Sequence, residues 1–145
     1  MDTKYEPGEV RVVAYDKDGV AQEEKRLCTS GTPYTLKLTL EEPTKTVPAQ
    51  DREHLVYVRV SVVDKQGNLC ATATPDVTFE VTGAGRYVAS ANGDAACIVP
   101  FQSKTMPAFS GQLTTIVAPS GTPGTITLTA SAPGLRSATL AIPTK

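Results

Sequence analysis

Apolar and polar residues alternate in short runs along most of the chain, which is the period of a β-strand with one buried face. The clearest run is LVYVRVSVV at 55–63, where Val stands at every second position from 56 to 62 and polar or aromatic residues stand between these valines. The segment 41–52 contains two prolines and several charges, and it is predicted to be a connection with room for a short edge strand. The same alternation predicts further strands at 9–15, 20–28, 34–40, 77–82, 85–89, 111–118, 124–131 and 135–142.

Gly or Pro stands at nearly every boundary between these runs, and no stretch shows apolar residues at the helical spacing of 3.6. Twenty Thr and fifteen Val add residues that favour strands. Strands at this spacing, without intervening helices, predict an all-β protein, most simply an immunoglobulin-like β-sandwich of about seven strands over 33–145.

The residues before this sandwich, 1–32, are predicted to form a β-hairpin that turns at the sequence DKDG, 16–19. An isolated two-stranded hairpin is marginally stable in water, so it must pack against something else. Residues 10–19, VRVVAYDKDG, align without gaps on 58–67, VRVSVVDKQG. This echo is explained either by strand-turn chemistry used twice or by a hairpin that closes a second, preceding sandwich.

Composition and charge exclude several classes of function. The 145 residues are too few for a (β/α)₈ barrel, which needs roughly 250 residues. A net charge of -1 provides no basic field for nucleic acid, and no apolar run approaches the roughly 20 residues of a membrane span. The first five residues, MDTKY, do not have the pattern of a signal peptide.

The order of motifs from Leu55 onward resembles the C-terminal immunoglobulin-like domain of bacterial family 2 glycoside hydrolases, of the β-galactosidase type. The segment at 5–19, YEPGEVRVVAYDKDG, resembles the closing hairpin of the domain that precedes it in those enzymes. One departure is AACIV at 95–99, where relatives often carry polar residues. The motifs that carry the resemblance are LVYVRVSVVDKQG at 55–67, PDVTFEVTGAG at 75–85, ANGD at 91–94, PFQ at 100–102, AFSG at 108–111 and GTPGTITLTASAPGL at 121–135.

This resemblance implies a non-catalytic C-terminal accessory domain whose parent enzyme would hydrolyse terminal β-galactosides. The family's catalytic glutamates lie on an upstream barrel, so the upstream domains of the same polypeptide would be its partners. The resemblance also implies a periplasmic or extracellular bacterial enzyme, and it leaves carbohydrate open as a ligand. Two alternatives remain: an independent carbohydrate-binding module, and a bacterial immunoglobulin-like spacer or adhesin repeat.

The sequence contains no pattern typical of a catalytic, cofactor or metal site. Its acidic residues fall mostly in predicted turns and charged edges, where solvated carboxylates are the rule. Asp16 and Asp18 hint at a calcium loop, but Leu27 stands where that loop needs a glutamate. The single histidine, His54, has no second ligand at zinc spacing and no nucleophile near it in sequence. We therefore expect no catalytic residue, cofactor or metal.

Aromatic residues would form any sugar-binding face. The chain has no Trp, and most of its Tyr and Phe fall on strand or core-like positions, which favours core or interface packing over a sugar platform. Phe101 and Phe109 flank a Met-Pro loop. With Asn92 and Asp94 they are the predicted domain-interface or weak ligand loop.

The cysteines, Cys28, Cys70 and Cys97, are odd in number, so at most one internal disulfide forms. No pairing follows from their spacing, and small buried hydrophobes are the favoured interpretation.

Overall fold

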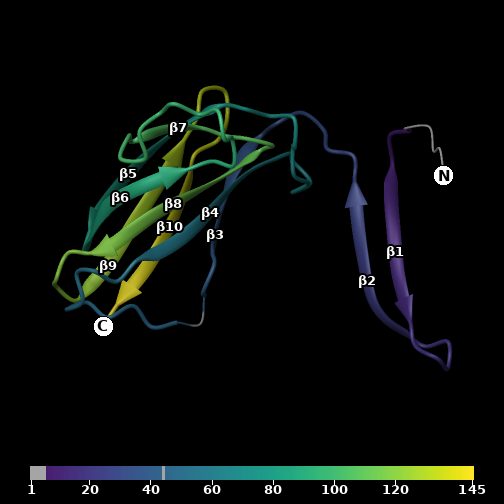
Figure 1. The fold of residues 1–145 in the computed structure, drawn as a ribbon, viewed down its shortest axis with the longest axis horizontal. Coiled ribbons are helices and arrows are strands. Elements are labelled where there is room, and N and C mark those ends of the chain that lie inside the picture. Colours follow the sequence, from purple (N-terminus) through teal and green to yellow (C-terminus); the bar gives the residue numbers. More distant parts are fainter. Residues whose placement is uncertain (1–5, 44) are drawn as a thin grey trace.

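A computed structural model describes residues 6–43 and 45–145, and within these ranges the chain forms ten β-strands and no helix. The expectations for residues 1–5 lie outside the described part. A two-stranded hairpin stands apart from a body of eight strands (Figure 1). The strands are β1 (Glu9–Tyr15), β2 (Ala21–Cys28), β3 (Thr35–Leu40), β4 (Val56–Val63), β5 (Asp76–Gly83), β6 (Gly85–Ala91), β7 (Thr105–Pro107), β8 (Gln112–Pro119), β9 (Gly124–Ser131) and β10 (Ala138–Thr144).

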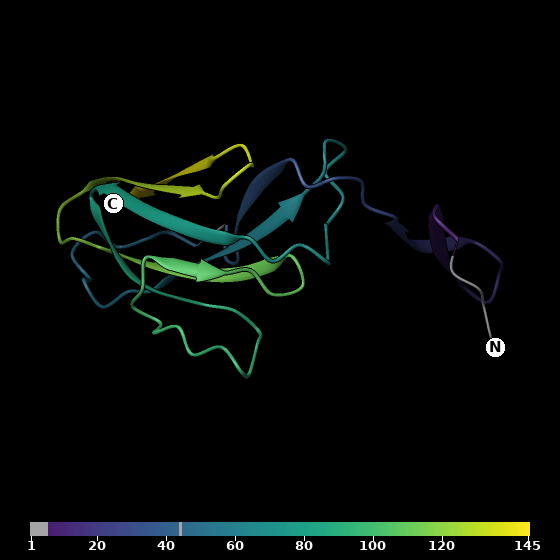
Figure 2. The same ribbon diagram turned by 90° about the horizontal axis from the view of Figure 1, so that it is seen from above.

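The eight-stranded body consists of two four-stranded antiparallel sheets. One has the order β3-β4-β8-β6 and the other β10-β9-β5-β7. Figure 2 shows these layers edge-on, and they form the predicted immunoglobulin-like sandwich. The prediction of about seven strands missed β7, a three-residue edge strand that ends in proline and shows no alternation. Among its described residues, the segment 41–52 contributes a single isolated bridge, from Val47 to Thr144, and no strand.

The alternation read from the sequence places the core between the sheets. Val58, Val60 and Val62 of β4 are fully buried, while the residues between them point outward. They face Phe79 of β5, which is 1% exposed, and Leu128 of β9, which is fully buried. Because each buried aliphatic or aromatic side chain contributes about 1.5–3 kcal/mol of hydrophobic free energy, this layer stabilises the sandwich without help from the hairpin.

The outer faces of the two sheets differ in chemistry. On the β10-β9-β5-β7 sheet the outward side chains are mostly threonines, and two pairs of them hydrogen-bond across strands: Thr78 with Thr105 at 2.9 Å, and Thr129 with Thr139 at 3.3 Å. The outer face of the β3-β4-β8-β6 sheet instead carries Tyr57 and the Arg59–Glu41 ion pair. The threonine face has the composition of a solvated surface, and the other face has that of a contact surface.

One face of the hairpin is charged. The other, called the apolar face below, has apolar residues toward the base of the hairpin and the exposed Lys25–Glu23 ion pair, at 3.5 Å, toward the tip. Arg11 bonds Glu24 at 2.6 Å on the charged face. On the other face the register pairs Val10 with Leu27, and Val12 follows on the same side. These side chains are 64%, 75% and 63% exposed, so the hairpin buries none of its own apolar face.

The sequence echo corresponds to the same turn built twice. Asp16 accepts backbone hydrogen bonds from residues two and four positions later, and Asp64 does the same. Each turn is completed by a glycine with positive φ, Gly19 at 76° and Gly67 at 89°. Turn chemistry therefore accounts for the shared Asp and Gly.

Candidate functional site

A groove of about 440 Å³ lies on the outer face of the β3-β4-β8-β6 sheet. Its volume falls in the range of small-molecule sites. Side chains of β4, β6 and β8 and of two turns meet there, and the floor is formed by small groups. The lining residues are Arg59, Ala91, Asn92, Gly93, Phe109, Ser110, Gln112, Leu113 and Thr114.

The aromatic ring of this groove, Phe109, is held by a tight turn at the start of β8. Phe109 and Gln112 exchange both backbone hydrogen bonds, at 2.9 and 3.0 Å. The two residues between them, Ser110 and Gly111, have φ of 50° and 72°, as a type I′ turn requires. Gly111 is buried, and a Cβ there would lie 2.4 Å from the carbonyl oxygen of Cys70. The turn thus fixes the backbone that carries the ring, and Phe109 remains 45% exposed.

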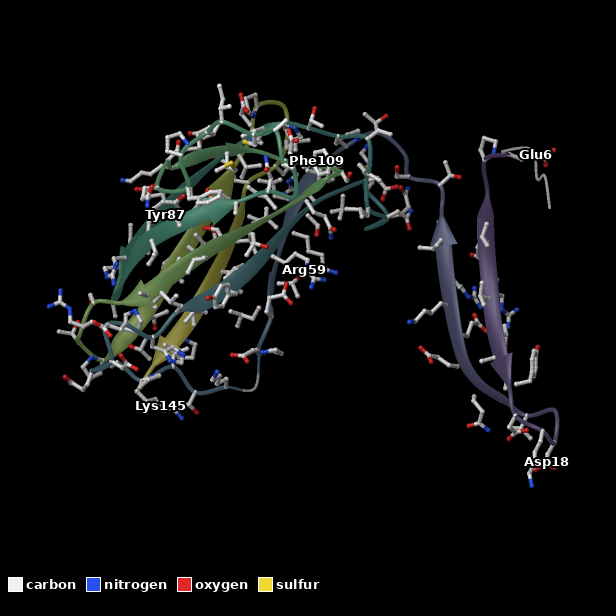
Figure 3. The ribbon with its side chains drawn as sticks, in the orientation of Figure 1. Glu6, Asp18, Arg59, Tyr87, Phe109 and Lys145 are labelled. Carbon is white, nitrogen blue, oxygen red and sulfur yellow. The ribbon has the colours of Figure 1, made fainter. Side chains whose placement is uncertain are left out.

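The polar groups of the groove are pre-oriented by their neighbours. Glu41 binds Arg59 through both carboxylate oxygens, each contact being 2.8 Å, so the guanidinium charge is paired in a fixed plane. Gln112 Nε2 donates to Ser61 Oγ at 3.2 Å, and among the described residues nothing donates to Gln112 Oε1. Figure 3 shows Arg59 and Phe109 on the sandwich, well away from the hairpin tip at Asp18.

The four predicted site residues are only partly brought together. Asn92 and Phe109 both line the groove, but Asn92 is committed to structure: its Nδ2 donates to the Pro107 carbonyl at 2.9 Å and its Oδ1 accepts from the Asp94 amide at 3.2 Å. Asp94 in turn accepts from the Ala96 amide at 2.9 Å and lies outside the groove lining. Phe101 is 62% exposed on the following loop and also lies outside it.

That loop joins β6 to β7 and projects from the sandwich (Figure 2). The Tyr87 hydroxyl anchors its end by donating to the carbonyl of Ser103, and burial raises the pKa of Tyr87 above its ordinary value. The Tyr87 ring also stacks on Phe79 in the core, with centroids 6.2 Å apart. Ile98, which is 95% exposed, shares the loop with Phe101. Within the departure at 95–99, Cys97 and Val99 are partly buried and pack against the core.

The polar groove residues Arg59, Gln112 and Thr114 were missed by sequence reasoning, as were the other lining residues apart from Asn92 and Phe109. Outward alternation on 55–63 marks Arg59 as exposed, but nothing in the sequence shows that Gln112, more than 50 positions later, lies beside it. Phe109, predicted for a domain-interface or weak ligand loop, is 45% exposed at the tight turn that precedes β8.

Asp64 ties the hairpin linker to the sandwich. Its carboxylate is 2% exposed and accepts from the Gly31 amide at 2.8 Å, in addition to its three bonds within the turn. These donors, the Gly31 amide first, lower the pKa of Asp64 to about 2.

The three cysteines, all within the described residues, form no disulfide. Cys70 is buried as expected and Cys97 is partly buried, but Cys28 is exposed, contrary to the favoured interpretation.

The described residues hold no group of three or more His, Cys, Asp or Glu side chains placed to bind a metal. None of the secondary structure in residues 6–43 and 45–145 is a helix with the length and apolar character to cross a membrane.

The family described as glycoside hydrolase family 2 C-terminal domain 5 matches residues 38–141. The β-galactosidase BoGH2A of Bacteroides ovatus is 37% identical over 139 residues, which are 96% of this chain and 16% of that protein. A β-glycosidase from Bacteroides vulgatus has a TM-score of 0.87 at 21% identity, and a glycosyl hydrolase family 2 member from Bacteroides cellulosilyticus has 0.86 at 23%. They cover 96% and 99% of this chain, which spans 18% of each, and at this identity they show the fold.

Proposed function

The chain belongs to the C-terminal domains of glycoside hydrolase family 2, as an accessory domain and not the catalytic one, and we propose that its role is to pack against the preceding domains of a β-galactosidase-like enzyme. It spans 16% of its curated relative, so domains upstream in the same polypeptide are the partners that fit. The family match favours this role over a spacer or adhesin repeat and over an independent binding module.

The observation that carries the proposal is the uncovered apolar face of the hairpin. Val10, Val12 and Leu27 are each more than 60% exposed, although they alternate as residues of a half-buried strand do. A hollow of about 740 Å³ also separates the base of the hairpin from Leu69 of the sandwich. An apolar face of this kind on a two-stranded sheet is typical of a surface that another part of the protein covers.

We therefore assign residues 1–32 to the end of a preceding β-sandwich and residues 33–145 to the C-terminal sandwich. Covering the apolar face would stabilise the junction, since burying one Val or Leu side chain contributes about 1.5–3 kcal/mol. The charged face, with Arg11 bound to Glu24, would remain toward solvent. The Gly31–Asp64 contact would then set the angle between the two domains.

A chimera tests this role. The 139 aligned residues of the Bacteroides ovatus enzyme are replaced by this chain, and hydrolysis of an aryl β-galactoside and thermal unfolding are measured. We expect the chimera to fold and to keep activity, and the chain alone to have none. Leu27→Glu should destabilise the chimera by about 2 kcal/mol, while both the isolated chain carrying it and a Val20→Glu control at the hairpin tip stay within about 0.5 kcal/mol.

A chimera that tolerates Leu27→Glu as well as Val20→Glu would overturn the covered hairpin. Hydrolysis by the isolated chain would contradict the accessory role itself.

We also propose that the parent enzyme works in the periplasm or outside the cell, as an enzyme that meets external glycans would. Fractionation of cells that produce the whole polypeptide is the measurement.

Carbohydrate is proposed as a ligand of the groove at Phe109 rather than of the hairpin.

A further inference from the structure

We propose that the groove at Phe109 binds one neutral pyranose unit of a glycan. The proposal rests on the proposed function in one respect, the choice of carbohydrate as the class of ligand. The groove residues are separate from the hairpin surface on which the accessory role depends.

The groove has room for one sugar ring beside one aromatic ring. Ala91 and Gly93 leave its floor low, and the Phe109 ring stands at its edge over Gly93. Phe109 is 45% exposed on a turn held by two backbone hydrogen bonds, so this backbone does not have to be organised when a ligand binds. A pyranose presents a face of C–H groups that packs on such a ring and a rim of hydroxyls that need polar partners.

The groove supplies those partners. Gln112 Oε1 has no donor among the described residues and is free to accept from a hydroxyl, while its Nε2 is fixed by Ser61. Arg59 uses Nε and one Nη for Glu41, which leaves its second Nη to donate into the groove. Thr114 contributes a hydroxyl that both donates and accepts. These groups line the same groove as one aromatic ring, a combination that suits an uncharged polyhydroxyl ligand.

The charge arrangement selects neutral sugars over uronic acids. The Arg59 guanidinium is already paired with Glu41 through two bonds, so a uronate gains little from it and meets the Glu41 carboxylate as well. A docked protein segment is disfavoured because the apolar residues that such a segment would need, Ile98 and Phe101, lie on the loop outside the groove lining.

The test is an amide NMR titration of the whole ¹⁵N-labelled chain with methyl β-D-galactopyranoside, raised to about 50 mM because an open one-ring site binds with a Kd on the order of 1 mM. We expect saturable shifts at Gly93, Ser110 and Gln112. Phe109→Ala should weaken binding at least about tenfold, and Phe101→Ala, at a more exposed phenylalanine outside the groove, should leave it unchanged.

Gly93→Ala is the second variant. Its methyl group would lie 3.4 Å from the edge of the Phe109 ring, an ordinary contact that preserves folding and fills the groove, so affinity should fall while the Tm holds. Sodium glucuronate should bind at least about tenfold more weakly than the neutral sugar.

Absence of saturable shifts, shifts that survive Phe109→Ala, or equal binding of glucuronate would each overturn the proposal. Amide shifts of groove residues that occur in the chimera but not on addition of sugar would also overturn the proposal, because that result identifies a protein contact. The stability of the chimera with Leu27→Glu is measured without sugar, so failure of either proposal is recognised separately.

Discussion

The turn that carries Phe109 allows a quantitative test of how the chain positions it. Gly111 has φ of 72°, and a Cβ there would lie 2.4 Å from the carbonyl oxygen and 2.9 Å from the carbonyl carbon of Cys70. Gly67 has a similar φ of 89°, but a Cβ there meets nothing within 4 Å. Alanine at the two positions therefore separates the cost of the backbone conformation from the cost of the close approach.

A left-handed residue with a side chain costs about 1–2 kcal/mol, and this is all that Gly67→Ala should lose. Gly111→Ala adds an overpacking penalty of about 1–3 kcal/mol, because backbone atoms are the obstacle and cannot rotate away. We expect a total loss of about 2–5 kcal/mol at Gly111. Its backbone also accepts from Val62 at 2.8 Å and donates to Ala73 at 3.0 Å, so a shift there disturbs both neighbouring segments.

The assay is urea unfolding at neutral pH, followed by circular dichroism, for the wild type and both variants. The denaturant slope should be the same in all three, so that midpoints report stability directly. The reasoning is refuted if Gly111→Ala loses no more stability than Gly67→Ala.

Three further measurements follow from the same contacts. The pKa of Asp64 is lowered from 3.8 to about 2 in the folded state, so its stabilising contribution is complete above about pH 4 and is lost as the pH falls toward 2; Asp64→Asn should flatten urea midpoints across that window. Deletion of residues 1–30 should leave the Tm of the sandwich within about 2 °C, because the hairpin side chains are exposed, and calorimetry checks this. Phe79→Ala should cost about 3–5 kcal/mol in urea unfolding, against less than about 0.5 kcal/mol for the exposed Phe101→Ala.

Local alternation predicted most strands of the sandwich well because their inward positions are also buried ones. It also predicted the two hairpin strands, although nearly all their residues are exposed. The strands over 9–15 and 124–131 match the structure at both ends, and Val58 to Val62 are buried where the pattern places them. β7 escaped prediction because three residues with a proline carry no period, and its existence depends on pairing with β5. Alternation can be read from the local sequence, whereas a three-residue edge strand forms only through its pairing with a distant strand.

The groove was only partly predictable for a related reason. Asn92 and Phe109 stood out as a turn residue and an aromatic residue, but the register that sets Arg59 opposite Thr114 is a product of the folded sheet. Asn92 and Asp94 were also selected because their side chains are polar. In the structure, these side chains accept hydrogen bonds within their own turn. Short-range hydrogen bonds of this kind account for many polar residues that resemble ligands.

The contact between Asp64 and Gly31 has a mechanical consequence for a multidomain enzyme. A linker of free residues would let the sandwich swing through a wide range of positions around its neighbour. Here the linker is clamped to the sandwich by a buried carboxylate immediately after the hairpin ends. If the hairpin is part of the preceding domain, the sandwich is carried as a stiff arm, and whatever its groove binds is held at a set distance from the rest of the polypeptide.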